Sequence, residues 1–434
     1  MPRAVFIIPP AFGHFNPTVP IARQLQQRNF SVEYLTNVDF EAEILRKGFS
    51  FVAHPESTIR RGDSTEFFDK QSRRVGLDVL RGVVQQLTKI LPPIIESTLE
   101  LFSAKKPSIV ITDDYRSVVG AVVAQVLNIP WATVIVTPIR QPDDLVPPAG
   151  SGLTLSHTIV GRMRKMVTQL YFRRILAPLV NTHLELSRRY ALNTRVVRNY
   201  WLSPDLTLSL TTPEFEFPRR TEIMGLRFVG PCIDFQQPLH TFGPLIQARG
   251  KRLAFISLGT INNNHPKFFH AAIQGCLTVD PEMHVIASAG NRIPANEFDK
   301  YPANVTVVPF APQLEILENA SIMITHGGMN SVSEAMFFGV PLVVFPVGAD
   351  QPDVAARVEH CGAGVRGDIK RHDSQYIAGL VARVFGQPSF AKNALRMRDA
   401  YRAAGGARKA AELLAELSGK TRDLQVHGPS LLDA

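Results

Sequence analysis

The sequence is poor in cysteine and has no long apolar run. Its three cysteines, Cys232, Cys276 and Cys361, lie far apart and form no CxxC pair, so neither a disulfide framework nor a zinc site is indicated. No apolar run reaches the ~18 residues of a membrane-spanning helix, and the apolar run at the start is too short for a signal peptide. We therefore expect a cytoplasmic protein.

Two motifs of nucleotide chemistry are also missing. No G-x-G-x-x-G follows an expected strand, which disfavours a nicotinamide oxidoreductase. No Asp-x-Asp triplet occurs anywhere in the chain. We therefore expect no cofactor and activity without a metal.

The composition is that of an ordinary globular protein with a basic surface. The 434 residues are 45% hydrophobic and 20% charged, and the length suffices for two or three domains. The net charge of +9 comes with scattered arginine pairs, which predict a solvated surface, with weak contact to a membrane surface as the alternative. No nucleic-acid motif accompanies them. The sequence does not indicate an oligomeric state.

Short β-branched runs alternate with helical stretches along both halves, a pattern typical of parallel α/β sheets. The expected strands are 4–8, 31–36, 51–52, 109–112, 132–136, 206–210, 253–258, 284–288, 305–308, 321–325 and 342–345. The expected helices include 17–28, 40–47, 117–127, 155–189 and 332–338, with a stretch at 77–102 broken at Pro92-Pro93. Loops are expected at 9–16 and 141–152, and a charged surface excursion at 60–75.

The alternation restarts after residues 230–250, where Pro and Gly recur without a period and predict a linker. We expect an N-terminal domain at 1–230, a linker at 231–250, a C-terminal domain at 251–420 and a disordered tail at 421–434. In this division, the last helix of the C-terminal domain is the element that can pack on the N-terminal domain.

An apolar stripe with helical spacing occurs in the basic segment 155–189. Its members are Ile159, Met163, Met166, Val167 and Leu170. Core packing is the expected explanation, ahead of an acceptor-binding wall or a membrane-facing surface.

A glycine-rich turn stands between an expected strand and helix at residues 326–331 (HGGMNS). Glycines let the backbone approach a ligand, and free N–H groups at a helix N-terminus bind phosphate. The alternative is that Ser331 and Glu334 form a capping box and only stabilise the helix. Spacing alone does not decide between the two.

His14 and Asp113 each follow an expected strand of the first half, where open α/β sheets place ligands. A histidine there is a candidate general base, and a carboxylate can orient its ring. The alternatives are a histidine that fixes a turn and an Asp113 or Asp114 that caps a helix.

The stretch from Phe310 to Gln351 resembles the donor signature of the UDP-glycosyltransferase superfamily. The signature runs aromatic-x-Pro-Gln, His-x-Gly-x-Asn-Ser-x-x-Glu, Gly-Val-Pro and Asp-Gln. The sequence matches it with Phe310-Ala311-Pro312-Gln313, His326 to Glu334, Gly339-Val340-Pro341 and Asp350-Gln351. One departure is Phe310, where the superfamily usually has Trp.

The resemblance extends to the first half, through Gly13-His14 and the Pro-x-x-Val-x-x-Asp type segment 107–113. It implies that His14 activates the acceptor and Asp113 is its partner, with Asp114 as the fallback. The closest likeness is to bacterial transferases acting on small molecules such as macrolides.

The resemblance also implies a donor site in the second half. The residues carried over are Thr260, His326, Gly328, Asn330 and Ser331 near the diphosphate, Phe310, Ala311 and Gln313 near the nucleoside, Glu334 at the ribose, and Asp350 and Gln351 at the sugar.

The implied fold is GT-B, in which two Rossmann-like α/β/α domains face each other across a cleft. The implied activity is an inverting transfer of a hexose, glucose as the first guess, from UDP to a hydroxyl of a hydrophobic small molecule. Two rivals are a nucleotide-sugar epimerase of the same architecture and a non-catalytic nucleotide-sugar binding protein.

Overall fold

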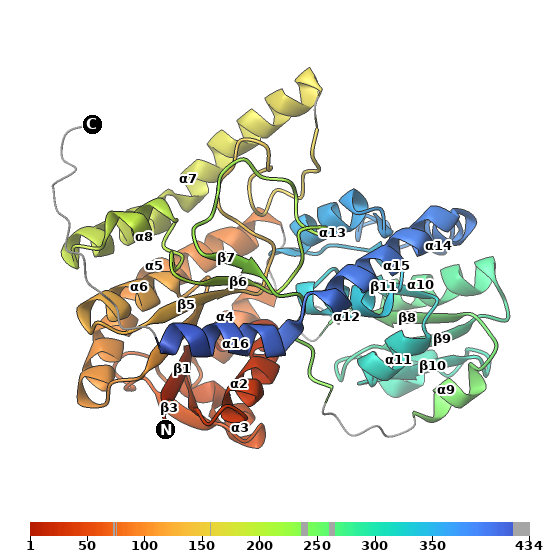
Figure 1. Cartoon of the computed structure of the whole chain (residues 1–434). Helices are drawn as coiled ribbons and strands as arrows, with labels where there is room; N and C mark the ends of the chain where they lie inside the picture. Colours follow the sequence, from red (N-terminus) through yellow and green to blue (C-terminus); the bar gives the residue numbers. More distant parts are fainter. Residues whose placement is uncertain (73, 75, 157, 236–241, 260–264, 420–434) are drawn as a thin grey trace.

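Two parallel sheets, each with helices on both faces, form the protein (Figure 1). The computed structural model describes residues 1–72, 74, 76–156, 158–235, 242–259 and 265–419. Two expectations, Thr260 at the diphosphate and the tail 421–434, lie outside these residues.

The first sheet has seven strands within the described residues, in the order β3-β2-β1-β4-β5-β6-β7. These strands are β1 (Arg3–Ile7), β2 (Ser31–Thr36), β3 (Ser50–Ala53), β4 (Ile109–Asp113), β5 (Trp131–Ile135), β6 (Thr207–Ser209) and β7 (Leu226–Phe228). Its helices are α1 (Phe12–Phe15), α2 (Val19–Gln26), α3 (Glu41–Arg46), α4 (Asp63–Ser72), α5 (Leu77–Ala104), α6 (Ser117–Val126), α7 (Ile159–Arg189) and α8 (Thr194–Arg198).

The second sheet has six strands within the described residues, in the order β10-β9-β8-β11-β12-β13. They are β8 (Leu253–Ser257), β9 (His284–Ser288), β10 (Val305–Val308), β11 (Ile322–Thr325), β12 (Leu342–Val344) and β13 (Gly364–Arg366). The helices of this half are α9 (Gly243–Gln247), α10 (Pro266–Val279), α11 (Gln313–Asn319), α12 (Met329–Phe338), α13 (Gln351–His360), α14 (Ser374–Gly386), α15 (Pro388–Ala403) and α16 (Gly406–Ser418).

Alternate side chains of the central strands pack in separate cores on the two faces of each sheet. In β1, Ala4 and Phe6 pack against α2 and α16, whereas Val5 and Ile7 pack against α5 and α6. A strand buried on both faces has to be apolar throughout, which explains the continuous runs in the sequence. The architecture is the GT-B arrangement of two α/β domains expected from the sequence.

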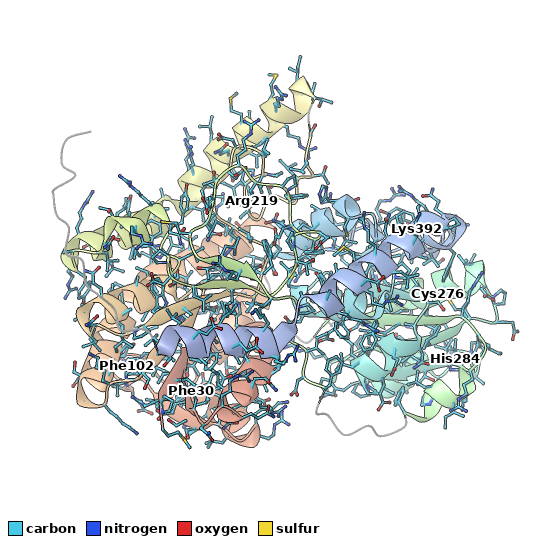
Figure 2. The ribbon with its side chains drawn as sticks, viewed as in Figure 1. Phe30, Phe102, Arg219, Cys276, His284 and Lys392 are labelled. Carbon is cyan, nitrogen blue, oxygen red and sulfur yellow. The ribbon has the colours of Figure 1, made fainter. Side chains whose placement is uncertain are left out.

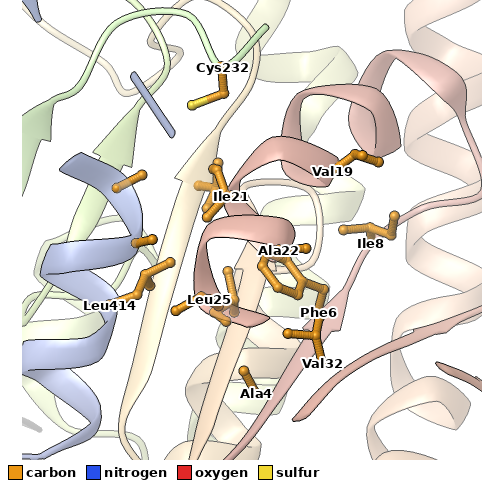
Figure 3. Packing of buried hydrophobic residues seen from close by; sticks show 14 of the residues in the cluster. Ala4, Phe6, Ile8, Val19, Ile21, Ala22, Leu25, Val32, Cys232 and Leu414 are labelled. Carbon is orange, nitrogen blue, oxygen red and sulfur yellow. The ribbon is translucent and has the colours of Figure 1, made fainter. Parts of the chain in front are cut away.

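The last helix, α16, crosses from the second half and packs on the first sheet's helices. Figure 3 shows Leu414 of α16 facing Ile21 and Leu25 of α2, and all three are buried. The C-terminal segment therefore ties the two halves together.

Three expectations about helices are wrong. The stretch at 77–102 is not broken, because α5 continues through Pro92 and Pro93. The buried face formed by Leu87, Leu91 and Ile94 outweighs the lost backbone hydrogen bonds. The excursion at 60–75 contains α4, and the loop at 9–16 contains α1.

The strands β7 and β13 were not expected from the sequence. Each has three residues and lies at a sheet edge. Their sequences LRF and GVR are too short and mixed to give a period. The expected linker at 231–250 also contains a helix, α9.

The apolar stripe on α7 is not part of a core, which also contradicts the expectation. Its five side chains are 55–79% exposed. In the described part of the chain, no helix is long and apolar enough to cross a membrane.

Candidate active site

The topology of the first sheet places His14 beside Asp113. β1 and β4 are parallel neighbours, with Ile7 paired to Thr112, so both strands end at the same edge. The short helix α1 follows β1 and carries His14, while Asp113 is the last residue of β4. His14 Nδ1 lies 2.6 Å from Asp113 Oδ2.

The environment of this pair keeps the carboxylate fixed and the imidazole accessible. The Asp113 side chain is fully buried, whereas that of His14 is 17% exposed. Asp113 Oδ1 accepts the backbone N–H of Arg116 at 3.0 Å, and the His14 ring meets Tyr115 edge-on. The contact to Nδ1 leaves Nε2 for an incoming hydroxyl.

Asp114, the alternative to Asp113, is engaged elsewhere. Its Oδ2 accepts hydrogen bonds from Arg140 Nε and Nη2 at 3.1 and 2.6 Å. The Arg140 guanidinium also stacks on Tyr115, 3.8 Å from the ring centroid. Burial raises the pKa of Asp114, and the Arg140 charge opposes that shift.

Arg140 is a residue of this site that the sequence did not reveal. It follows the carboxyl end of β5, the neighbour of β4, and its charge acts on both Asp114 and Asp350. An arginine after a strand end is the signal that could have suggested it.

Two glycines, Gly259 after β8 and Gly328 in the glycine-rich turn, lie against the His326 ring. A Cβ atom on Gly259 would lie 2.6 Å from its Cε1, and one on Gly328 would lie 2.7 Å from its Nε2. Gly259 and Gly327 also have positive φ angles of 74° and 85°, which favour glycine. Desolvation lowers the pKa of His326 to about 4, although a hydrogen bond to the Ser257 backbone favours the charged form.

The capping-box interpretation of Ser331 and Glu334 is wrong. α12 begins at Met329 with Gly328 as its N-cap, so Ser331 lies inside the first turn. Glu334 Oε2 instead accepts a hydrogen bond from Gln313 Nε2 at 2.5 Å, and Gln313 also donates to Ser331 Oγ at 3.4 Å. Desolvation raises the pKa of Glu334 to about 7 despite this bond.

The end of α12 follows the expectation from the sequence. Gly339 adopts a left-handed φ of 77° at the C-cap, and Pro341 comes two residues later. This arrangement ends the helix. At the other end, the backbone N–H groups of the first turn point toward the space beyond β11.

The Asp350-Gln351 pair begins α13. Gln351 Oε1 accepts the N–H groups of Val347 and Gly348 at 2.8 and 3.1 Å, which leaves its amide as a donor. The preceding Ala349 has a φ of 56°, an unfavourable value for a residue with a Cβ. Burial raises the pKa of Asp350, while the nearby His14 and Arg140 act in the opposite direction.

A hydrogen bond of Asn330 joins the two halves of the protein. Asn330 Nδ2 of α12 donates to the backbone oxygen of Gly13 at 3.3 Å. This contact brings the N-terminus of α12 next to the turn that carries His14. The side-chain amides of Gln313 and Gln351 instead bond within the second half.

A cavity of about 330 Å³ lies between the halves and under the start of the linker. Its walls include Ala311, Gln313, Asn330 and Glu334 from the second half, and Lys47, the residue that follows α3. Phe310 is 64% exposed, so one ring face is open for stacking. No group of three or more His, Cys, Asp or Glu side chains that could hold a metal is found among the described residues.

Comparison with known proteins gives matches along nearly the whole chain. An uncharacterized UDP-glucosyltransferase, YojK of Bacillus subtilis (strain 168), is 28% identical over 411 residues, which are 94% of this chain and 95% of YojK. The 4'-demethylrebeccamycin synthase of Lentzea aerocolonigenes is 28% identical over 424 residues, covering 95% of this chain and 98% of that protein.

A solved structure shares the fold. The Streptomyces sp. SF2575 glycosyltransferase SsfS6, complexed with thymidine diphosphate, has a TM-score of 0.65 and 18% identity. The match covers 96% of this chain and 100% of SsfS6.

Residues 97–402 match the family described as UDP-glucoronosyl and UDP-glucosyl transferase. The chain is therefore a glycosyltransferase that belongs to this family, within the UDP-glycosyltransferase superfamily.

Proposed function

We propose that this enzyme transfers a sugar from a UDP-sugar to a hydroxyl of a hydrophobic small molecule, with inversion at the anomeric carbon. Glucose is the first candidate for the sugar, because Asp350-Gln351 resembles the pair seen with glucose-type donors. The observation that carries the proposal is the 2.6 Å contact between His14 and Asp113, on a turn that Asn330 joins to the N-terminus of α12.

The chemistry begins at His14. Nε2 takes the acceptor hydroxyl proton as that oxygen attacks the anomeric carbon from the face opposite the leaving group. The bond from this carbon to the diphosphate oxygen breaks, and its electron pair leaves with the nucleotide. Asp113 stabilises the imidazolium that forms on His14.

The second half receives the charge of the leaving diphosphate. The first-turn N–H groups of α12, Ser331 and the His326 ring are the donors for that charge. His326 acts as a neutral hydrogen-bond donor, because its pKa of about 4 leaves the ring uncharged at neutral pH. Phe310 stacks on the base, Ala311 bonds its edge, Gln313 lies near the nucleoside, and Glu334 accepts from the ribose hydroxyls.

The acceptor class follows from two supports. The relative named 4'-demethylrebeccamycin synthase is named for a small-molecule product, and residues 145–186, which follow β5, include many apolar side chains. We infer a hydrophobic aglycone such as a polyketide, a terpenoid or a phenolic compound.

A mass-spectrometric transfer screen tests the proposal. UDP- and dTDP-sugars are crossed with an acceptor library, with and without EDTA. We expect a glycoside that forms best from UDP-glucose and forms equally well with EDTA. Its inverted configuration is read from the anomeric coupling in an NMR spectrum of the product. Turnover of the nucleotide sugar with no acceptor would favour the epimerase, and tight UDP binding without turnover would favour a binding protein.

A further inference from the structure

The outer half of α7, residues 159–174, carries a row of exposed apolar side chains. Figure 1 shows this end of the helix, in yellow, standing away from both sheets, and Figure 2 shows its side chains extending into open space. The exposed members of the face are Ile159 (79%), Val160 (76%), Met163 (59%), Met166 (56%), Val167 (63%) and Leu170 (55%). An unbroken exposed apolar surface of this kind marks an interaction site.

Helical spacing collects these residues on one side. At 100° per residue, Ile159, Met163, Met166 and Leu170 lie within about 60° of one another, with Val167 beside them. The opposite side of this part of the helix faces the protein, where Phe172 is buried and Lys165 Nζ binds the backbone oxygens of Asp143 and Asp144. The apolar side therefore points outward by construction.

Arginines border the apolar face, and acidic residues are absent from its neighbourhood in the sequence. Arg162, Arg164, Arg173 and Arg174 are exposed. No hydrogen bond or ion pair of their guanidinium groups is found within the part of the chain that the structure describes. The sequence contains no Asp or Glu between Asp144 and Glu185.

We propose that the outer half of α7 lies on the surface of an anionic lipid bilayer, with its apolar face in the interface and its arginines at the lipid phosphates. An apolar face bordered by basic side chains is the arrangement of a helix that lies in the membrane interface. The charge distribution selects this occupant. A second copy docked on the same face would bring arginines against arginines with no acidic residue in the outer half of either helix. None of these residues lines the cavity between the two halves.

Vesicle sedimentation with the full-length protein tests the proposal. We expect binding to phosphatidylcholine vesicles that contain about 30% phosphatidylglycerol. Binding to vesicles of phosphatidylcholine alone, or at high salt, should be weaker by about tenfold or more, because the lipid charge is absent or screened.

Two variants separate the apolar and the electrostatic contributions. The double variant Met163→Ser/Val167→Ser should lose about tenfold in binding to the anionic vesicles. Arg162→Gln/Arg173→Gln should lose a similar factor and most of the salt dependence. Both should keep the unfolding midpoint of the parent, because these side chains are exposed. The matched control is Val126→Ser/Leu395→Ser, which removes apolar side chains that are 50% and 43% exposed on other helices and should bind like the parent.

The result that overturns the proposal is specific. Equal binding by the parent and Met163→Ser/Val167→Ser, or no binding of the parent to anionic vesicles, would remove the lipid surface as the partner. Sedimentation equilibrium addresses the second copy. A parent dimer that this variant converts to a monomer would identify the face as a subunit interface instead.

Discussion

At the scale of single residues, His14 carries the proposed chemistry. We expect His14→Ala to lower turnover with alcohol acceptors by about 10²–10⁴-fold, the usual loss for a general base. Asp113→Asn should also lower turnover, because an amide cannot stabilise the imidazolium. UDP affinity, measured by calorimetry, should stay unchanged in both variants, since the donor residues lie in the other half. Transfer by His14→Ala at the rate of the parent would contradict the assignment.

Glu334 offers a second prediction, because its role in binding conflicts with its role in stability. Desolvation raises its pKa from 4.5 to about 7. Between these two pH values the unfolded chain ionises first, so the free energy of unfolding falls as the pH rises and is flat above about 7. We expect Glu334→Gln to remove this fall and to be more stable at pH 8 by up to about 3 kcal/mol.

The same variant should bind UDP more weakly. An amide provides one acceptor oxygen where the carboxylate provides two for the ribose hydroxyls. The parent should also prefer UDP to dTDP, which lacks the 2'-hydroxyl, and Glu334→Gln should lose part of that preference. Denaturant unfolding at pH 4.5 and pH 8, with competition calorimetry, checks both effects. Equal UDP and dTDP affinities in the parent would leave Glu334 without a ribose role.

The sequence allowed the positions of many site residues to be proposed, but not their partners. The placement of His14 and Asp113 followed from the rule that parallel strands end at one edge, and their 2.6 Å contact is consistent with that rule. Arg140 was missed because its partners, Asp114 and Tyr115, are some 25 positions earlier and meet it only through the fold. The capping box failed because a short-range pattern cannot tell which residue begins a helix when two glycines precede it.

At the scale of elements, the glycines around α12 set the position of the His326 ring. Gly328 has a φ of −61°, which alanine also adopts, so Gly328→Ala should not strain the backbone. Its new Cβ would lie 2.7 Å from His326 Nε2 and force the ring to move. We expect UDP affinity to fall by about tenfold or more, with little change in the unfolding midpoint, since a ring is displaced and not a core residue.

The matched control is Gly379→Ala in α14, where a new Cβ meets nothing within 4 Å. Alanine should stabilise this helix slightly and leave UDP affinity as it was. Calorimetry and thermal unfolding of both variants check the prediction. Unchanged UDP affinity in Gly328→Ala would show that the ring position does not matter for the diphosphate.

The same scale explains why the elements were predicted unevenly. Strands such as β2 and β9 follow from short stretches rich in apolar and β-branched residues, and their bounds agree with the expectation. Helical spacing in α7 correctly indicated an apolar face but not what covers it, since amphipathicity specifies a surface and not its partner. α5 continues through Pro92 and Pro93 because the burial of one helix face stabilises the helix by more than the two prolines destabilise it. The sequence shows the prolines but not the packing of that face.

At the scale of the whole molecule, the two halves are joined by polar contacts around α13. The Arg357 guanidinium lies 2.8 Å from the Glu216 carboxylate, and both side chains are at most 4% exposed. Asp353 accepts the backbone N–H groups of Gly150 and Gly152. The loop that follows β5 is thereby held to α13, the helix that has Asp350 as its N-cap and Gln351 as its first residue.

This linkage makes the Arg357–Glu216 pair a test of coupling between acceptor and donor sides. Arg357→Met leaves the Glu216 carboxylate buried without its partner, and the loss of stability should be about 3–5 kcal/mol. The double variant Arg357→Met/Glu216→Gln removes both charges and should recover most of the lost stability, because no ion stays unpaired.

If the pair also positions the two halves, the double variant should have a raised KM for the acceptor with UDP affinity unchanged. Denaturant unfolding of the two single variants and the double variant measures the free energy of unfolding, and steady-state kinetics measure the KM for the acceptor. Additive losses in the cycle would mean that the two side chains contribute independently, and an unaltered KM for the acceptor would restrict the pair to stability.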